Sequence, residues 1–230
     1  MAAVPPNRLE VLRTLRYANL DGALATAFGT LVGGTFMVGF IRMLHGADIW
    51  YGLLAAIPSL CGVFQVPGAI LSRSVSSYKR FVAPGGLIWR LLYVPFILFP
   101  LLHWAPNLLL TSIAMLIGVA SVSVMMVGPT YNDWLAEMVP VETRGSFFSR
   151  RNAIIVFVGA FVGVLGAALL DAFRAAGHEA IGFSSIFALG LVCGGVSWIY
   201  FQRMYDLQRP EVVPVRLREG LSQLKGPFAD

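Results

Sequence analysis

The sequence predicts an all-α polytopic membrane protein with six transmembrane helices. Its 230 residues are 57% hydrophobic and only 13% charged, and the mean hydropathy is +0.73, whereas soluble domains carry roughly 25% charged residues. A hydrocarbon core about 30 Å thick requires about 20 apolar residues in a helix. Six apolar runs are long enough, at residues 20–41, 51–71, 81–102, 108–129, 152–170 and 181–201. None of them alternates apolar with polar residues, as a spanning strand would.

Polar segments flank the predicted six-span bundle at both ends. We expect residues 1–19 to form an N-terminal tail and residues 202–230 to form a linker or C-terminal tail. Within the second segment, residues 210–214 should be extended because a proline stands at each end, and residues 216–225 have leucines spaced for a short surface helix. The beginning of the chain lacks the apolar core of a cleavable signal peptide, so insertion is expected to begin with the first span.

Basic residues are distributed very unequally between the two sides of the expected bundle. Of the 17 Lys and Arg residues, fourteen fall in the N-terminal tail, between spans two and three, in the charged stretch 132–151 between spans four and five, and in the C-terminal tail. Only Arg42 and Arg174 lie on the opposite side, and Arg90 lies within a span. Short loops rich in Lys and Arg stay in the cytoplasm. We therefore expect an integral protein of the bacterial cytoplasmic (inner) membrane, surrounded by the lipid bilayer, with both termini cytoplasmic.

Small residues within the spans predict close helix packing. Glycines recur at positions i and i+4 in spans one, five and six, a spacing that lets helix backbones approach each other. Prolines within or at the ends of spans each remove a backbone donor and can bend the helix. The glycine pairs are Gly29 and Gly33, Gly159 and Gly163, and Gly190 and Gly194; the prolines are Pro58, Pro67, Pro95, Pro100 and Pro129.

Two ionisable residues stand within or at the start of spans, where charged groups are costly and mark functional sites. Arg90 lies well inside span three. It either contacts a substrate anion, forms half of a gating ion pair, makes a structural pair with Asp133 or Asp21, or extends toward the cytoplasmic interface. Asp21 opens span one and either caps that helix or takes part in proton coupling.

Acidic and basic residues follow one another closely after span four. Asp133 and Glu137 are one helical turn apart at the end of that span, and Arg144 and Arg151 come after a short loop. Opposite charges so placed predict a cytoplasmic charge network rather than a substrate site.

Several function classes are disfavoured by the sequence. The basic residues form short clusters between apolar runs, without the basic stripe of a nucleic-acid-binding helix, so no nucleic-acid partner is expected. Cys61 and Cys193 lie inside apolar runs and offer neither a disulfide framework nor a metal-binding spacing. The motifs HExxH, GxSxG and GxxxxGK[ST] are absent. We expect no enzyme activity, no cofactor and no metal, and we expect any transport to be driven by an ion or solute gradient.

The order of spans and charged loops resembles the N-terminal half of a major facilitator superfamily transporter. The stretch PTYNDWLAEMVPVETRGSFFSRRNA is similar to that family's cytoplasmic loop between spans four and five. There a proline is followed by Arg-Gly and then by further arginines. The matching residues are Pro140, Arg144, Gly145, Arg150 and Arg151.

The family's other signature, between spans two and three, is matched in part. It combines glycine, an acid and basic residues, and here Gly68, Arg73, Lys79 and Arg80 match it. Ser72 stands in place of the acid. In the family that acid helps to latch the two halves of the transporter together on the cytoplasmic side, so the serine leaves open whether this chain uses such a latch.

The resemblance implies that the six helices form two inverted three-helix repeats, which together make up half of the family's fold. It also implies a second six-helix half, in the same polypeptide or in a partner chain, and a small-molecule substrate moved by alternating access. The alternative is a non-transporting membrane interaction or assembly protein derived from the same fold.

In the family, spans one and four line the central cavity, and this nominates most of the candidate residues. Gln65, the amide within span two, is either a cavity residue or a helix–helix hydrogen bond. The substrate or cavity candidates are Arg90, Asp21, Thr26, Thr30, Thr35, Gln65, Ser121, Ser123 and Asn132. The expected cytoplasmic gating network comprises Gly68, Arg73, Lys79, Arg80, Asp133, Glu137, Arg144, Gly145 and Arg151.

Overall fold

The computed structural model describes residues 7–102 and 104–209. Within these residues the chain is helical, apart from turns and one isolated antiparallel bridge between Ser77 and Gln208. Six helical stretches, each made of one or more consecutive segments, are long and apolar enough to cross a membrane. The prediction of an all-α protein with six membrane-spanning helices is confirmed at this level. The expected extended segment 210–214 and surface helix 216–225 lie outside the described residues.

Three of the six spans consist of more than one helical segment. Span one contains α1 (Arg8–Val32) and α2 (Gly34–Met43), and span two contains α3 (Ile49–Leu60), η1 (Cys61–Phe64) and α4 (Gln65–Ser72). Span three contains α5 (Tyr78–Leu91), η2 (Val94–Ile97) and η3 (Phe99–Leu101). Span four is α6 (Pro106–Met138), span five follows η4 (Val141–Thr143) as α7 (Arg144–Ala175), and span six is α8 (Glu179–Gln202).

The first helix begins earlier than the expected span at residue 20. Asn7 caps it: its side-chain oxygen accepts a hydrogen bond from the Leu9 amide at 2.8 Å, and its own amide donates to the Glu10 carboxylate at 2.9 Å. Such a capping box satisfies the free amides of a helix start. Residues 8–19 are therefore part of α1 and not a separate tail.

The charged stretch 132–151 is mostly helical rather than a loop. Helix α6 continues to Met138 and α7 starts at Arg144, so only residues 139–143 connect them. Pro140 stands in this turn, where its ring disfavours the helical conformation of the residue before it. Arg144 then donates from Nε to the carbonyl of Val139 at 3.1 Å, which satisfies a backbone acceptor left free by the end of α6.

Glycine and proline explain the breaks inside spans. The chain leaves helical geometry at Gly33, and Gly34 has φ +47°, a left-handed conformation that glycine adopts without strain. Pro58 lies inside α3 before the chain tightens into η1, and Pro95 and Pro100 stand in the first turns of η2 and η3. Because proline lacks an amide donor, it is tolerated at such starts and bends a helix elsewhere.

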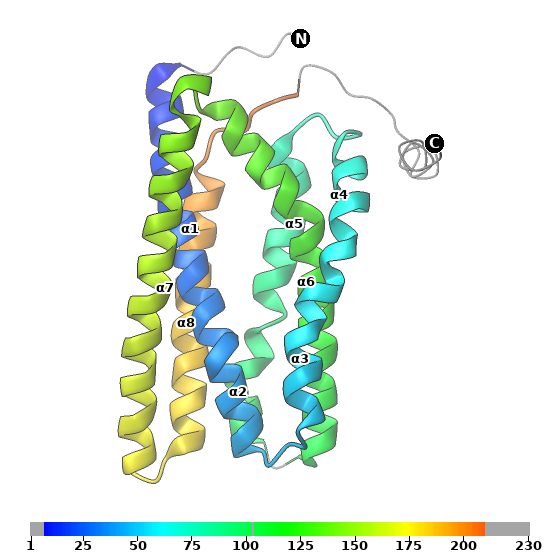
Figure 1. Cartoon of the computed structure of the whole chain (residues 1–230), viewed down its shortest axis with the longest axis vertical. Helices are drawn as coiled ribbons and strands as arrows, with labels where there is room; N and C mark the ends of the chain where they lie inside the picture. Colours follow the sequence, from blue (N-terminus) through cyan, green and yellow to red (C-terminus); the bar gives the residue numbers. More distant parts are fainter. Residues whose placement is uncertain (1–6, 103, 210–230) are drawn as a thin grey trace.

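The spans form two groups that lie side by side (Figure 1). Helices α1, α7 and α8 pack together, and α6 packs against α3, α4 and α5. Helix α1 begins and α8 ends at the same end of the bundle, which also holds the connections 73–77 and 139–143. We call this the charged end, because most of the described arginines lie in the helix ends and connections found there. Arg42 and Arg174 lie at the other end.

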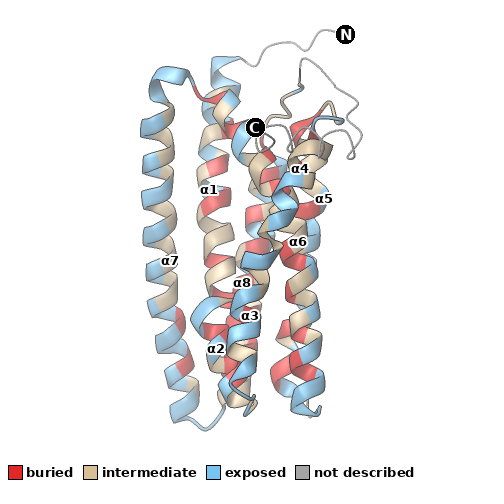
Figure 2. Ribbon diagram, turned by 45° about the vertical axis from the view of Figure 1, so that its right-hand side comes forward, coloured by how far each residue is buried: buried red, intermediate tan, exposed pale blue. Residues whose placement is uncertain are grey.

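Burial is uneven among the spans. Helices α1 and α8 contribute many buried side chains, whereas α7 buries only Gly166 and Leu170 (Figure 2). Large apolar residues of α7 and of span two are exposed. Such faces suit a surrounding bilayer or another helical subunit. The exposed residues include Val156, Phe157, Phe161, Val164 and Leu165 in α7 and Ile49, Leu60 and Val63 in span two.

Two of the three expected glycine pairs lie where helices meet. A Cβ on Gly190 would lie 2.9 Å from Val32 of α1, and one on Gly194 would lie 3.2 Å from Phe28. The pair in α7 also faces α1. A Cβ on Gly159 would lie 3.3 Å from Thr26 and one on Gly163 would lie 3.7 Å from Thr30.

The third pair is not a helix contact. A Cβ on Gly29 would meet nothing within 4 Å, and Gly33 is the residue at which α1 ends. Gly68 makes a closer approach than any of these six, because a Cβ there would lie 2.1 Å from the Met126 carbonyl oxygen of α6.

Candidate functional site: a charged cavity between the spans

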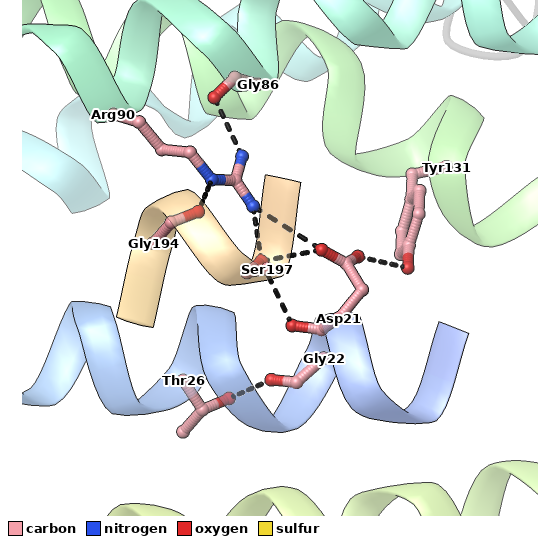
Figure 3. Close-up of polar contacts among 8 residues, drawn as sticks. All are labelled: Asp21, Gly22, Thr26, Gly86, Arg90, Tyr131, Gly194 and Ser197. Atoms are coloured by element: carbon pink, nitrogen blue, oxygen red, sulfur yellow. Dashed lines mark hydrogen bonds and ion pairs between the residues drawn. The ribbon is translucent and has the colours of Figure 1, made fainter. Parts of the chain in front are cut away.

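Asp21 lies inside α1 and does not cap it. The residue is 5% exposed, and three side chains from other spans converge on its carboxylate. Ser197 of α8 donates to Oδ1 at 2.6 Å, Tyr131 of α6 donates to Oδ2 at 2.8 Å, and Arg90 of α5 approaches Oδ1 at 3.4 Å (Figure 3). The carboxylate therefore joins spans one, three, four and six.

Arg90 is buried with a nearly complete set of acceptors. It is 9% exposed and forms an ion pair with Asp21 rather than with Asp133. Its Nε donates to the Gly194 carbonyl and its Nη1 to the Gly86 carbonyl, both at 2.8 Å, while Nη2 donates to Ser197 Oγ at 2.6 Å (Figure 3). Buried charges are tolerated when they are paired and hydrogen-bonded, and both conditions hold here.

Aromatic rings and small residues complete the surroundings of Arg90. Its guanidinium carbon lies 5.4 Å from the ring centre of Trp89 and 5.5 Å from that of Trp198. Cations at this distance from an indole are attracted by its quadrupole. Gly194 has no side chain, so its backbone carbonyl is reachable where α8 packs on α1.

A cavity of about 250 Å³ opens beside this ion pair. Spans one, three, four, five and six all contribute to its wall. Most of the wall is apolar or aromatic. The charged and hydroxyl-bearing residues are Asp21, Arg90, Arg151, Tyr131 and Thr26; the others are Gly22, Ala25, Val82, Gly86, Trp89, Val124, Val127, Gly128, Ile155, Trp198 and Phe201.

Arg151 reaches this cavity from α7. Its guanidinium carbon lies 5.8 Å from the ring centre of Tyr131, and its Nε is buried without a hydrogen-bond partner. A Cβ on Gly22 would lie 2.7 Å from the Arg151 guanidinium, so the glycine leaves the space that this side chain fills. No carboxylate in the described part of the chain lies within ion-pair distance of Arg151.

Only some of the cavity candidates line this cavity. Asp21, Arg90 and Thr26 do, and the Thr26 hydroxyl donates to the Gly22 carbonyl at 2.8 Å. Thr30 faces the α7 glycines instead. Gln65 is exposed and its amide nitrogen lies 3.4 Å from the Met125 sulfur of α6, a helix–helix contact.

The remaining cavity candidates lie elsewhere. Asn132 and Thr35 are exposed, and Ser121 is buried in α6 without lining the cavity. Ser123 donates to the carbonyl of Val119 in its own helix. Tyr131 and Ser197, which complete the site, are not among the expected residues. A hydroxyl within an otherwise apolar run is the signal that points to Ser197.

The expected charge network comprises Asp133, Glu137, Arg144 and Arg151. None of the ion pairs among the described residues joins these side chains. Arg144 instead donates to the Val139 carbonyl after the end of α6, and Arg151 lines the cavity. Glu137 accepts a hydrogen bond from the Tyr78 hydroxyl at 2.5 Å, and Asp133, Gly145, Arg73 and Arg80 are exposed.

A different set of contacts closes the charged end. Residues 203–209, after α8, return to residues 72–80, and we call this contact the clasp. The Ser77 hydroxyl donates to Asp206 at 2.6 Å, and the Arg209 amide donates to the Ser76 carbonyl at 2.7 Å. Lys79 donates to the carbonyls of Gln202 at 2.5 Å and Met204 at 3.2 Å.

Arg209 covers Ser72 at the end of α4. Its guanidinium donates to the Ser72 carbonyl and, at 3.3 Å, to the Ser72 hydroxyl. The same guanidinium lies 4.2 Å from the ring centre of Tyr78. Ser72 is therefore buried by a basic residue of the same chain.

Comparisons with known proteins give no relative: no protein-family model, no curated protein and no solved structure matches this chain.

Proposed function

We propose that this chain is one six-helix half of a secondary transporter of the major facilitator type. The proposed activity is movement of a small solute across the membrane by alternating access, driven by a gradient. The observation that carries the proposal is the buried Asp21–Arg90 pair at the edge of a cavity shared by five spans. Ionisable residues inside membrane proteins face water-filled cavities and mark solute or ion pathways.

The packing of the spans supports two inverted repeats. Span one packs against spans five and six, and span four packs against spans two and three. If each of spans one, two and three is exchanged with span four, five and six respectively, the contacts of span one become the contacts of span four. Inverted three-helix repeats are expected to behave in this way, with the site where the repeats meet. The cavity wall, which includes Asp21 from span one and Tyr131 from span four, is consistent with such a site.

The distribution of charge supports the proposed orientation. The start of α1, the end of α8 and the two basic connections share the charged end of the bundle. Basic loops stay on the cytoplasmic side, so we infer cytoplasmic termini and a location in the bacterial inner membrane. The exposed apolar faces of span two and α7 are the surfaces on which a second six-helix half would pack.

Accessibility of the cavity from both sides of the membrane tests this function. In a background where Cys61 and Cys193 are replaced by alanine, Thr26→Cys is placed on the cavity wall. A membrane-impermeant maleimide is expected to label it from outside in intact cells and from the cytoplasmic side in inside-out vesicles. The matched control is Val164→Cys on the exposed face of α7, which is expected to remain unlabelled.

Access from neither side, or from one side only, would contradict alternating access. We further expect no solute uptake by the purified chain alone in vesicles, because the second half is needed to complete the pathway.

The clasp favours a second candidate, a non-transporting membrane interaction or assembly protein. Arg209 hydrogen-bonds to Ser72, which stands where the family resemblance places the acid that latches two halves together. Restoring the acid with Ser72→Asp separates the two functions. If the latch serves transport, Ser72→Asp will change the two-sided labelling of Thr26→Cys, because a carboxylate there pairs with Arg209 or with the second half. Unchanged two-sided labelling would show that this chain does not use such a latch, whereas labelling from neither side in the unaltered chain would favour the non-transporting candidate.

A further inference from the structure

The cavity holds more positive than negative charge. Asp21 is the acidic residue in its wall, and Arg90 and Arg151 are the basic ones. Both oxygens of Asp21 accept hydrogen bonds from Ser197, Tyr131 and Arg90, so this carboxylate is already satisfied. Arg90 is satisfied in the same way by two backbone carbonyls and Ser197. The pair is a neutral unit, and Arg151 is the surplus charge.

The guanidinium of Arg151 has an unused donor. Its Nε is buried without a hydrogen-bond partner, and no described carboxylate lies within ion-pair distance. Arg151 is half-buried beside Tyr131, and a partly buried charge without a carboxylate at ion-pair distance is unfavourable in a membrane protein. An anion bound in the cavity would supply a counter-charge and an acceptor for Nε. Guanidinium matches the planar geometry of a carboxylate, which accepts two parallel hydrogen bonds from it.

The rest of the wall suits an apolar body. Trp89, Trp198 and Phe201 supply aromatic surface, and Val82 and Val127 supply aliphatic surface. The volume of about 250 Å³ lies just below the range of ordinary small-molecule sites, so the ligand should be small. A highly hydrated dianion would leave its second charge against these apolar walls, which is costly.

We propose that this cavity binds a small organic monocarboxylate, with its carboxylate on Arg151 and its apolar body against the aromatic and valine side chains. The Asp21–Arg90 pair then has a positioning role, since it fixes Tyr131 beside the guanidinium. The description of this ligand as a transported substrate rests on the proposed function, whereas its binding does not.

Binding is tested by isothermal titration of the purified full chain with benzoate as the probe. Benzoate is expected to bind, while benzamide, which is neutral and of the same shape, and benzylamine, which is cationic, should bind at least tenfold more weakly. Arg151→Gln should weaken benzoate binding at least tenfold, because it removes the charged donor. The matched control is Arg150→Gln, an exposed neighbour on the same helix, which should leave the affinity unchanged.

Several results would overturn the proposal. Equal binding of benzamide and benzoate by the unaltered chain would show that charge is not recognised, whatever the folding of the variants. Preference for benzylamine would assign the cavity to cations. Phosphatidylglycerol retained through purification by the unaltered chain but not by Arg151→Gln, together with no benzoate binding, would assign the cavity to a lipid headgroup.

The binding test and the labelling test fail separately. Benzoate binding without two-sided labelling of Thr26→Cys would support the anion site and contradict transport. Two-sided labelling without benzoate binding would contradict the anion site and support transport.

Discussion

Removing the Asp21 carboxylate tests the buried ion pair at the centre of the bundle. In Asp21→Asn the shape of the side chain is kept and its charge is lost. Arg90 then remains in a site where its side chain is only 10% exposed, with its hydrogen bonds to the Gly194 and Gly86 carbonyls but without a counter-charge. Breaking a buried pair in this way leaves an uncompensated charge, which is strongly destabilising.

The size of the effect follows from the geometry. At the 3.4 Å between Arg90 Nη2 and Asp21 Oδ1, an effective dielectric constant of about 20 gives a Coulomb attraction of roughly 5 kcal/mol. Measured losses on breaking buried pairs are about 3 to 5 kcal/mol. We therefore expect Asp21→Asn to lower the free energy of unfolding by roughly 3 kcal/mol or more.

An exposed pair in the same chain provides the matched control. Arg174 lies 3.4 Å from Asp171, but the two side chains are 40% and 73% exposed. Exposed pairs contribute about 0 to 1 kcal/mol. Asp171→Asn should therefore change the free energy of unfolding by less than about 1 kcal/mol at the same separation of charges.

The assay is reversible unfolding in mixed micelles, titrated with a denaturing detergent and followed by tryptophan fluorescence. A double-mutant cycle with Asp21→Asn and Arg90→Gln isolates the pair, because the second substitution should cost much less once the first is present. Additivity within about 0.5 kcal/mol, or an equal loss in Asp171→Asn, would refute the view that the two charges depend on each other.

Two further predictions concern helix packing and the clasp. Gly68→Ala should lower the free energy of unfolding by about 1 to 3 kcal/mol, because its Cβ would overlap a backbone carbonyl of α6. The control Gly29→Ala, where a Cβ meets nothing within 4 Å, should be neutral or slightly stabilising. Equal effects of the two substitutions in the same unfolding assay would contradict this packing. Arg209→Gln should speed amide hydrogen exchange in residues 72–80 at least tenfold by releasing the clasp, whereas exposed Arg203→Gln should not, and unchanged exchange in the first variant would show that the clasp contributes no protection.

The number of spans could be predicted from the sequence because a bilayer imposes a minimum length on apolar runs. Their ends were less accessible to such reasoning. Hydropathy marks where a helix enters lipid, but hydrogen bonding decides where it starts, so the capping pair of Asn7 and Glu10 extends α1 well beyond its apolar part. Likewise Pro140, rather than the charge of the surrounding residues, marks the turn between α6 and α7.

The candidate site was predictable only in part. Because a charge in a membrane is costly, the sequence alone indicates that Arg90 and Asp21 are each functional candidates. It does not decide whether the acidic partner of Arg90 is Asp21 or Asp133. The partner depends on which helix faces are packed together, and the glycine surface of α8 decides this by bringing Gly194 and Ser197 onto α1.

The clasp had no sequence signal at all. Asp206 and Arg209 belong to a polar segment whose partners lie far back in the chain, and nothing local indicates that they return to Ser77 and Ser72.

The most direct test of the account is the side of the membrane on which the basic connections lie. Single cysteines are introduced at Ser74, between spans two and three, and at His178, between spans five and six, in the background without Cys61 and Cys193. An impermeant maleimide is expected to label His178→Cys in intact cells and to reach Ser74→Cys only after the membrane is opened. Labelling of Ser74→Cys from outside intact cells would contradict the orientation and remove the support that the charge distribution gives to a transporter half.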